Sequence, residues 1–309
     1  MANKEKLRSL INSNEAGRDL VGLEIGPSFD PIVAKRDGHN VEILDHMSAA
    51  DLRLKYQNAP HVDLSAIEEV DYISDGGSIF ELVGKPAHYD YIVASHVIEH
   101  TVDLLRFLED CQGLLKPDGR LILAVPDMRF SFDCLRPVST TGQVVEAYFE
   151  KAKRHSLAKL FDEMAYNCRR EGEIGWPRGT VGKLAFFRPV ADAKWILEEY
   201  RKDEAFVDIH AWQFSPSSFR LIVSDLYKLG LIELREQSFD ASQDNEFFVV
   251  LSKNAGGCPL TRMALAECIL VEQTAIFARI PFDPRKFFRN LRNRAALGPR
   301  IRALWSRVN

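Results

Sequence analysis

Residues 21–31, with the sequence VGLEIGPSFDP, restrict the fold more than any other stretch. The first five read as a buried strand, Gly26 as a turn, and Asp30 with Pro31 as the N-cap and first position of a short helix. A strand, a glycine turn and a helix N-terminus in this order are how α/β folds hold nucleotide-like ligands. The three-glycine dinucleotide fingerprint is interrupted, because a proline and a serine follow Gly26. A strand, turn and helix without a ligand is the alternative.

Four further strands follow, each separated from the next by a helical or loop stretch. They are expected at residues 40–45, 69–75, 89–95 and 120–125. Alternating strands and helices with nearly continuous apolar strands predict a parallel sheet covered on both faces. Such sheets bind ligands at the carboxyl ends of their strands. One polar cluster is therefore predicted there, made of Glu24, Gly26, Asp45, Asp75, Ser95, His96 and Asp127.

Residues 128–212 break this alternation with three helical patches and a Gly/Pro-rich joint, and are expected to overhang the site as a lid. A helix over 215–229 and strands over 231–236 and 246–252 then predict an antiparallel hairpin at the sheet edge. The predicted fold is α/β and Rossmann-like, with a seven-stranded, mostly parallel sheet. Its expected parts are an α/β core of residues 1–127, a helical lid insertion of 128–212, the end of the core at 213–254, and a helical C-terminal appendage of 255–309.

The composition is ordinary for a soluble globular chain, with 46% hydrophobic and 27% charged residues. The first 18 residues are polar and carry no secretion signal. The most apolar stretch, residues 263–282, is interrupted by charged side chains, so no membrane span is expected. The five cysteines are scattered, odd in number and without a C-x-x-C pair. We therefore expect reduced thiols, no disulfide framework, no metal site and a cytoplasmic location.

The net charge of −4 hides an uneven distribution. Residues 279–309 carry nine Lys/Arg and one acid, a net of +8, which leaves −12 for residues 1–278. The acidic body argues against general nucleic-acid binding. Helical spacing within residues 281–309 places four apolar side chains on one face, namely Ile301, Leu304, Trp305 and Val308. This basic amphipathic segment is a candidate for peripheral membrane binding, for a protein partner, for a homodimer contact or for packing on the acidic body.

Five motifs in order resemble class I S-adenosylmethionine-dependent methyltransferases. They are LEIG at 23–26, the acid Asp45, SDG at 74–76, YDYIVASHVIEH at 89–100 and LLKPDGRL at 114–121. They resemble in particular the large group of small bacterial methyltransferase domains that often accompany glycan or secondary-metabolite pathways. The resemblance spans roughly residues 20–128 and resumes at 215–252, where the terminal hairpin is typical of this family and not of dehydrogenases. The family usually carries further glycines where this chain has Pro27, Ser28 and Asp30.

The resemblance implies a role in binding S-adenosylmethionine for each matching residue. The implied contacts are Glu24, Gly26, Pro27 and Ser28 for the methionine part, Asp45 for the ribose hydroxyls, Asp75 and Gly76 for adenine, and Ser95 and His96 near the sulfonium. A carboxylate that accepts two ribose hydroxyls is a strong and orienting contact. In the alternative interpretation Glu24 caps a helix, Asp45 and Asp75 are solvated loop residues, His96 closes the pocket floor, and His100 is structural.

Methyl transfer from a sulfonium is an in-line displacement, for which the protein mainly supplies proximity and alignment. A hydroxyl acceptor benefits from a general base, whereas a carboxylate acceptor needs none. The candidate catalytic residues are His96, Asp127 and His210, the last because it precedes the helix that returns to the core. The alternative for His210 is packing within the lid. Arg129 and Arg136 are candidates for binding an anionic acceptor, with an ordinary surface position as the alternative.

The predicted function is transfer of a methyl group from S-adenosylmethionine to a hydroxyl or carboxyl of a small-molecule or glycan acceptor. The lid is expected to determine which acceptor binds. Two other functions stay open. One is a catalytically silent subunit that docks a partner in a glycan pathway. The other is a nicotinamide-dependent oxidoreductase, which the interrupted glycine pattern and the terminal hairpin disfavour.

Overall fold

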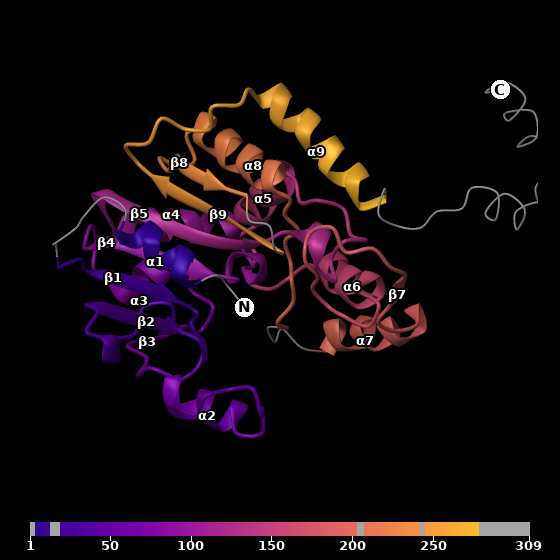
Figure 1. Ribbon diagram of the computed structural model, residues 1–309, viewed down its shortest axis with the longest axis horizontal. Helices are drawn as coiled ribbons and strands as arrows, with labels where there is room; N and C mark the ends of the chain where they lie inside the picture. Colours follow the sequence, from indigo (N-terminus) through magenta and orange to yellow (C-terminus); the bar gives the residue numbers. More distant parts are fainter. Residues whose placement is uncertain (1–3, 13–18, 203–206, 242–244, 278–309) are drawn as a thin grey trace, which may run out of the picture.

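The computed structural model describes residues 4–12, 19–202, 207–241 and 245–277. A central sheet is flanked by helices, and a smaller, mainly helical unit lies beyond one end of its strands (Figure 1). The basic segment 281–309, and with it the predicted membrane, protein or homodimer contact, lies outside the described residues.

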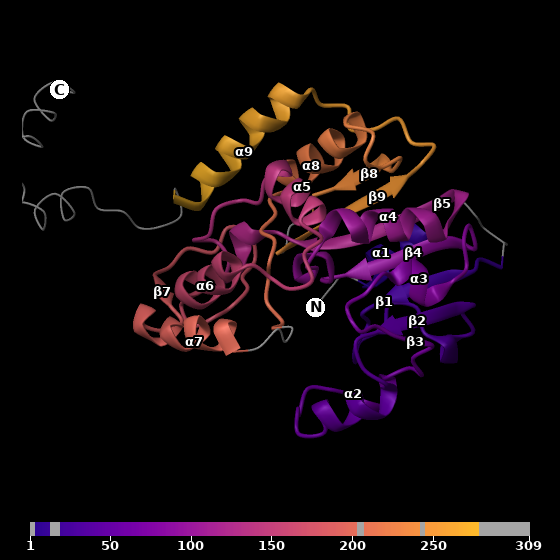
Figure 2. The ribbon, with the colours of Figure 1, turned by 180° about the vertical axis from the view of Figure 1, so that it is seen from behind.

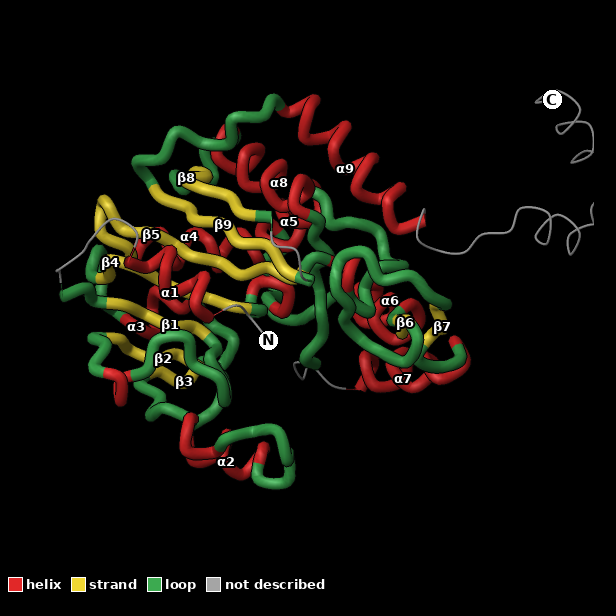
Figure 3. Tube along the Cα trace, viewed as in Figure 1, coloured by secondary structure: helices red, strands yellow, loops and turns green. Residues whose placement is uncertain are grey.

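The sheet has the predicted architecture. Its strands are β1 (Gly22–Ile25), β2 (Val41–Asp45), β3 (Tyr72–Ile73), β4 (Tyr89–Ser95), β5 (Leu115–Pro126), β8 (Arg235–Asp240) and β9 (Glu246–Ser252). They lie side by side in the order β3-β2-β1-β4-β5-β9-β8 (Figure 3). The first five run parallel, and β9 is antiparallel to both β5 and β8. The mostly parallel sheet with an antiparallel terminal hairpin is therefore confirmed.

Helices cover both faces of this sheet. The helices are α1 (Lys4–Asn12), α2 (Ala49–Tyr56), α3 (Ile79–Val83), α4 (Leu104–Leu114), α5 (Thr141–Phe149), α6 (Leu157–Tyr166), α7 (Lys194–Lys202), α8 (Pro216–Lys228) and α9 (Arg262–Phe277). Side chains alternate between the faces of a strand. Tyr91 and Val93 of β4 accordingly share a core with α1, whereas Ile92 and Ala94 pack in the larger core with α4 and α8. Figure 2 shows this second face from behind.

The helices of the larger core begin at ordinary capping residues. The Asp103 side chain accepts a hydrogen bond from the N–H of Arg106 (3.0 Å) at the start of α4. Ser215 and Ser218 form a capping box at the start of α8, where Pro216 occupies a position that needs no N–H donor. Because these capping signals are local, the sequence predicts where both helices begin.

The segment after β1 differs from the prediction. Asp30 and Pro31 do not open an α-helix, since the connection to β2 is irregular apart from one 3-10 turn, Lys35–Asp37. The reason is a long-range contact. The Glu24 carboxylate accepts the N–H groups of Ile32 (2.7 Å) and Val33 (3.0 Å), which ties this segment to β1.

Two other elements also differ. A two-stranded antiparallel hairpin, β6 (Cys168–Arg170) and β7 (Leu184–Phe186), stands where a helix end and a Gly/Pro-rich joint were expected. The strand expected from residue 231 begins at Arg235, because the Gln112 side chain takes the N–H groups of Glu233 and Leu234. In both cases the decisive partner is distant in sequence.

Of the elements between β5 and α8, α6, β6, β7 and α7 lie beyond the carboxyl ends of the parallel strands, whereas α5 packs beside α4 and α8 (Figure 1). This is the stretch for which the sequence predicts a lid. Further along the chain, α9 packs along α8 through a pair between Arg262 and Asp225 (2.9 Å). Glu272 of α9 also accepts the hydroxyls of Ser215 (2.6 Å) and Ser217 (2.8 Å). In the described part of the chain, every helix is too short or too polar to cross a bilayer.

Candidate active site

The turns that follow β1 and β4 meet at the carboxyl edge of the sheet. Gly26 (φ 68°), Ser28 (φ 54°) and His96 (φ 53°) all adopt the left-handed conformation. This conformation is strained for residues with a side chain and is concentrated at functional sites. A Cβ at position 26 would lie 2.8 Å from Cγ2 of Val97, so the close approach of the two turns requires glycine. Ser28 adopts a left-handed conformation that glycine usually adopts. The turn therefore forms here with a serine at a position where the resemblance leads us to expect a glycine.

Two buried carboxylates pin this turn. Glu24 is 1% exposed, and its oxygens accept the N–H groups of Ile32 and Val33. Burial raises the pKa of Glu24 to about 7. Asp45, also 1% exposed, accepts the N–H of Ser28 at 2.8 Å. Direct cofactor contact is predicted for Glu24, and within the described residues its carboxylate contacts the backbone N–H groups of Ile32 and Val33.

Asp75 lies at the same edge of the sheet but is exposed to solvent, unlike Glu24 and Asp45. The strand neighbours place Glu24, Asp45 and Asp75 at the ends of β1, β2 and β3 in turn. Asp75 is exposed, and its Oδ1 accepts the N–H of Gly77 at 2.9 Å. Gly76 has φ 89° and open space where a Cβ would stand. The three acids thus share one edge, but only Asp75 faces solvent.

His96 lies next to Ser95 at the end of β4 and contacts two carboxylates. Its Nε2 is 2.9 Å from Oε2 of Glu246 on β9, and its Nδ1 is 3.6 Å from Oε1 of Glu99. Asp127, the second predicted catalytic residue, is 1% exposed and bound on both oxygens by Arg129 (2.8 and 2.5 Å). Because this pair occupies the carboxylate, we leave Asp127 out of the proposed bases and Arg129 out of the proposed anion ligands.

His210 is held within the insertion. Its Nδ1 lies 2.6 Å from Oδ2 of Asp133, and its ring packs against Phe132 and His100. Burial opposes the charged ring, but the Asp133 carboxylate outweighs it and the pKa of His210 rises to about 9. His210 in this state is protonated at neutral pH and lacks the free lone pair of a general base. Arg136 is also buried, since Asp133 binds its guanidinium at 2.9 Å.

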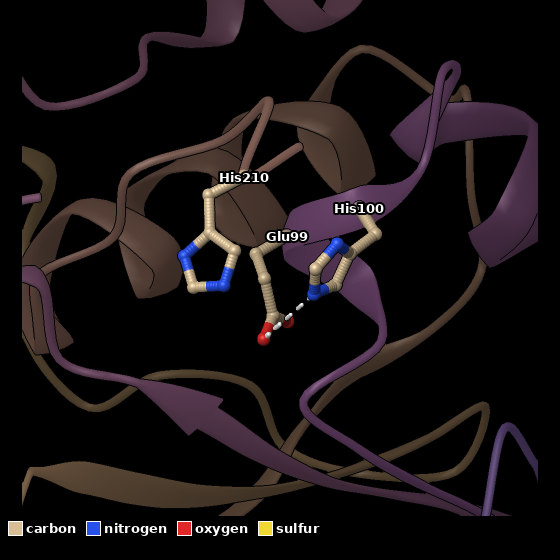
Figure 4. A group of neighbouring side chains, drawn as sticks. All are labelled: Glu99, His100 and His210. Atoms are coloured by element: carbon tan, nitrogen blue, oxygen red, sulfur yellow. Dashed lines mark ion pairs between the residues drawn. The ribbon is translucent and has the colours of Figure 1, made fainter. Parts of the chain in front are cut away.

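Glu99 is a functional candidate beyond those predicted from the sequence, although it lies in the motif YDYIVASHVIEH at 89–100. Its side chain is fully buried, and within the described residues neither oxygen has a hydrogen-bond partner. Its backbone oxygen accepts the N–H groups of Ala211 (2.7 Å) and Trp212 (3.1 Å), which joins the returning chain to the turn after β4. Figure 4 shows its carboxylate between the rings of His100 and His210.

The match to a family model decides the classification. A model described as a methyltransferase domain matches residues 8–188, more than half of the chain. The chain belongs to this methyltransferase family. The family match supports the resemblance to class I enzymes and S-adenosylmethionine as cofactor. No curated protein matched the chain.

Solved structures with a similar fold share little sequence with this methyltransferase. One is a SAM-dependent methyltransferase from Aquifex aeolicus, with a TM-score of 0.40, 12% identity and coverage of 81% of this chain and 88% of that chain. Another is the CcbJ methyltransferase from Streptomyces caelestis, with a TM-score of 0.41, 10% identity and coverage of 80% of this chain and 94% of that chain. The match to the CMeT domain of citrinin polyketide synthase has a TM-score of 0.40 and 14% identity, and covers 82% of this chain and 51% of that chain. At these scores the classification depends on the family match.

Proposed function

We propose that this chain transfers a methyl group from S-adenosylmethionine to a hydroxyl or carboxyl of a small-molecule or glycan acceptor. The observation that carries the proposal is the family match over residues 8–188, which includes all five parallel strands and the turns between them. The acceptor class is inferred separately, from the insertion. A cytoplasmic location and a glycan pathway remain predictions.

The residues at the carboxyl edge fit this cofactor, because Gly76 leaves open space beside the backbone and the positive φ of Gly26 lets the first turn form without a side chain. When bound, the cofactor supplies an activated methyl group for an in-line displacement. The residues proposed to hold it are Gly26, Pro27 and Ser28 for the methionine part, Asp45 for ribose, Asp75 and Gly76 for adenine, and Ser95 and His96 near the sulfonium. Glu24 fixes the conformation of the first turn from behind.

The His46 ring lies against the Asp45 carboxylate. The His46 side chain is 51% exposed, and its Nδ1 lies 2.6 Å from Oδ1 of Asp45. We propose that a ribose hydroxyl takes the place of this exposed ring at Oδ1, which keeps the backbone N–H of His46 (2.7 Å), while Oδ2 keeps the N–H of Ser28 (2.8 Å).

A basic cavity within the insertion supports an anionic acceptor. It has a volume of about 490 Å³, and its lining has more basic than acidic side chains: Arg136, Lys151, Lys153, Arg154 and Lys159 against Glu146, Glu150 and Asp162. Burial lowers the pKa of Lys159 to about 7, and an anionic ligand would restore its charge. We propose that a carboxylate or phosphate of the acceptor binds here while the methylated oxygen faces the strand ends.

A labelled-methyl assay tests this function. The full chain is incubated with methyl-labelled S-adenosylmethionine and a panel of neutral sugars, uronic acids and phosphorylated sugars. We expect transfer to an anionic member, and Lys159→Met should raise the KM for that acceptor about tenfold, the value of one charge-assisted hydrogen bond. The KM for the cofactor should not change.

Lys228→Met, an exposed substitution on α8, is the matched control. Transfer to neutral acceptors alone would contradict the anionic class. Cofactor binding without transfer to any acceptor would instead favour the silent docking subunit.

A further inference from the structure

Glu99 poses an unusual problem of charge. A fully buried carboxylate normally has hydrogen-bond partners or a counter-ion, because desolvation is costly. Of the residues described, those nearest its charge are histidines at ion-pair distance. His96 Nδ1 lies 3.6 Å and His100 Nε2 3.8 Å from Oε1 of Glu99. These separations are longer than hydrogen bonds, so the carboxylate is surrounded by nitrogen atoms that it does not bond.

Two of the histidines near Glu99 are each oriented by another carboxylate. Nδ1 of His100 lies 2.8 Å from Oδ1 of Asp208, and Nδ1 of His210 lies 2.6 Å from Oδ2 of Asp133. Each ring thus keeps Nε2 for a second contact, and on His210 a metal ion would displace the proton that Asp133 favours, because metal ligands are deprotonated. Histidines that bind metals characteristically hold their other nitrogen against a carboxylate in this way.

The three groups converge. One ligand atom from each of Glu99, His100 and His210 lies within 4.8 Å of the others. The two rings flank the Glu99 carboxylate in Figure 4. Two histidines and one carboxylate form a donor set suited to Zn²⁺, Fe²⁺ or Mn²⁺ and leave coordination positions open.

We propose that Glu99, His100 and His210 bind one divalent transition-metal ion. Metal bonds of about 2.0–2.2 Å require donors roughly 3.3 Å apart, so the three groups draw closer when the ion binds. The framework is in place beforehand, because Ala211 and Trp212 donate their N–H groups to the backbone oxygen of Glu99. The sequence predicted no metal site, since its cysteines form no motif, and the proposal replaces that expectation.

The position of the site suggests what the ion does, an inference that rests on the proposed function. His96 connects the two regions, because it follows Ser95 at the cofactor edge and its Nδ1 faces Glu99. An ion beside it would bind and orient the acceptor oxygen through an open coordination position. By binding the acceptor oxygen, such an ion would also favour loss of its proton. This matters because Arg129 occupies the Asp127 carboxylate and Asp133 favours the protonated ring of His210.

Metal binding is measured directly on the full chain. Purified protein stripped with a chelator is titrated separately with Mn²⁺, followed by electron paramagnetic resonance, and with Zn²⁺, followed by calorimetry. We expect one site for at least one of these ions, and Glu99→Gln should abolish binding to that site. Asp208→Asn, on an exposed side chain, should weaken binding about 10- to 100-fold because it frees the His100 ring.

His39→Gln is the matched control, since His39 is exposed and distant in sequence from the cluster. Thermal unfolding verifies that each variant is folded. If Glu99→Gln does not fold, the proposal is tested with Asp208→Asn. Failure of wild-type protein to bind either ion would overturn the proposal and favour a histidine–glutamate ion-pair network. Unchanged affinity in both Glu99→Gln and Asp208→Asn would also overturn it. Binding of S-adenosylhomocysteine in the same samples distinguishes this failure from failure of the proposed function.

Discussion

Replacement of Asp45 by asparagine should weaken binding of S-adenosylmethionine about 10- to 100-fold. A hydrogen bond to a charged group contributes about 1.5–3 kcal/mol, which corresponds to one or two powers of ten in affinity. Asparagine keeps the size of Asp45 and one carbonyl acceptor, so the N–H of Ser28 can retain a partner. The dissociation constant is measured by calorimetry on wild type and variant.

Asp63→Asn is the control for this substitution. Asp63 caps the 3-10 turn Leu64–Ala66 and is exposed, and asparagine caps equally well. Its cofactor affinity should equal that of the wild type. An Asp45→Asn variant that binds the cofactor as tightly as this control would show that ribose recognition lies elsewhere.

Removal of the Arg220 charge should destabilise the fold by about 3–5 kcal/mol, the usual effect of leaving a buried ionic partner alone. Arg220 on α8 binds Glu236 on β8 through two hydrogen bonds of 2.7 Å, and both residues are under a tenth exposed. In Arg220→Met the Glu236 carboxylate stays buried without its partner. Urea unfolding of the full chain measures the loss in free energy.

The double variant Arg220→Met with Glu236→Leu should recover most of that loss, because it removes the orphaned charge together with the pair. Arg262→Met offers a comparison on a pair with Asp225 in which the arginine is exposed and the carboxylate keeps the Thr141 hydroxyl, so a smaller change is expected. A double variant less stable than Arg220→Met alone would show that the orphaned Glu236 charge is not the cause of the loss.

Local patterns were sufficient for most of the sheet. The strand expected at 89–95 is β4, and the capping signals before α4 and α8 lie where the helices begin. The carboxyl edge followed from strand order, because parallel strands bring their ends together. Apolar runs and turn residues are contained within a few positions of the chain, so a sequence displays them directly.

The remaining features depend on contacts between distant residues. The Glu24 side chain replaced an expected helix with an irregular turn, and the Asp133 partner of His210 lies 77 positions away from it. The Glu99 site requires His210 to return from the far end of the insertion. The raised pKa of His210 likewise depends on Asp133, a neighbour that the local sequence does not reveal.

The central claim is that the carboxyl edge of this sheet holds S-adenosylmethionine. Calorimetric titration of the full chain with S-adenosylhomocysteine, the product of methyl transfer, tests it most directly. The account predicts one molecule bound per chain and no heat from NAD⁺ under the same conditions. Saturable binding of NAD⁺ with none of S-adenosylhomocysteine would contradict it.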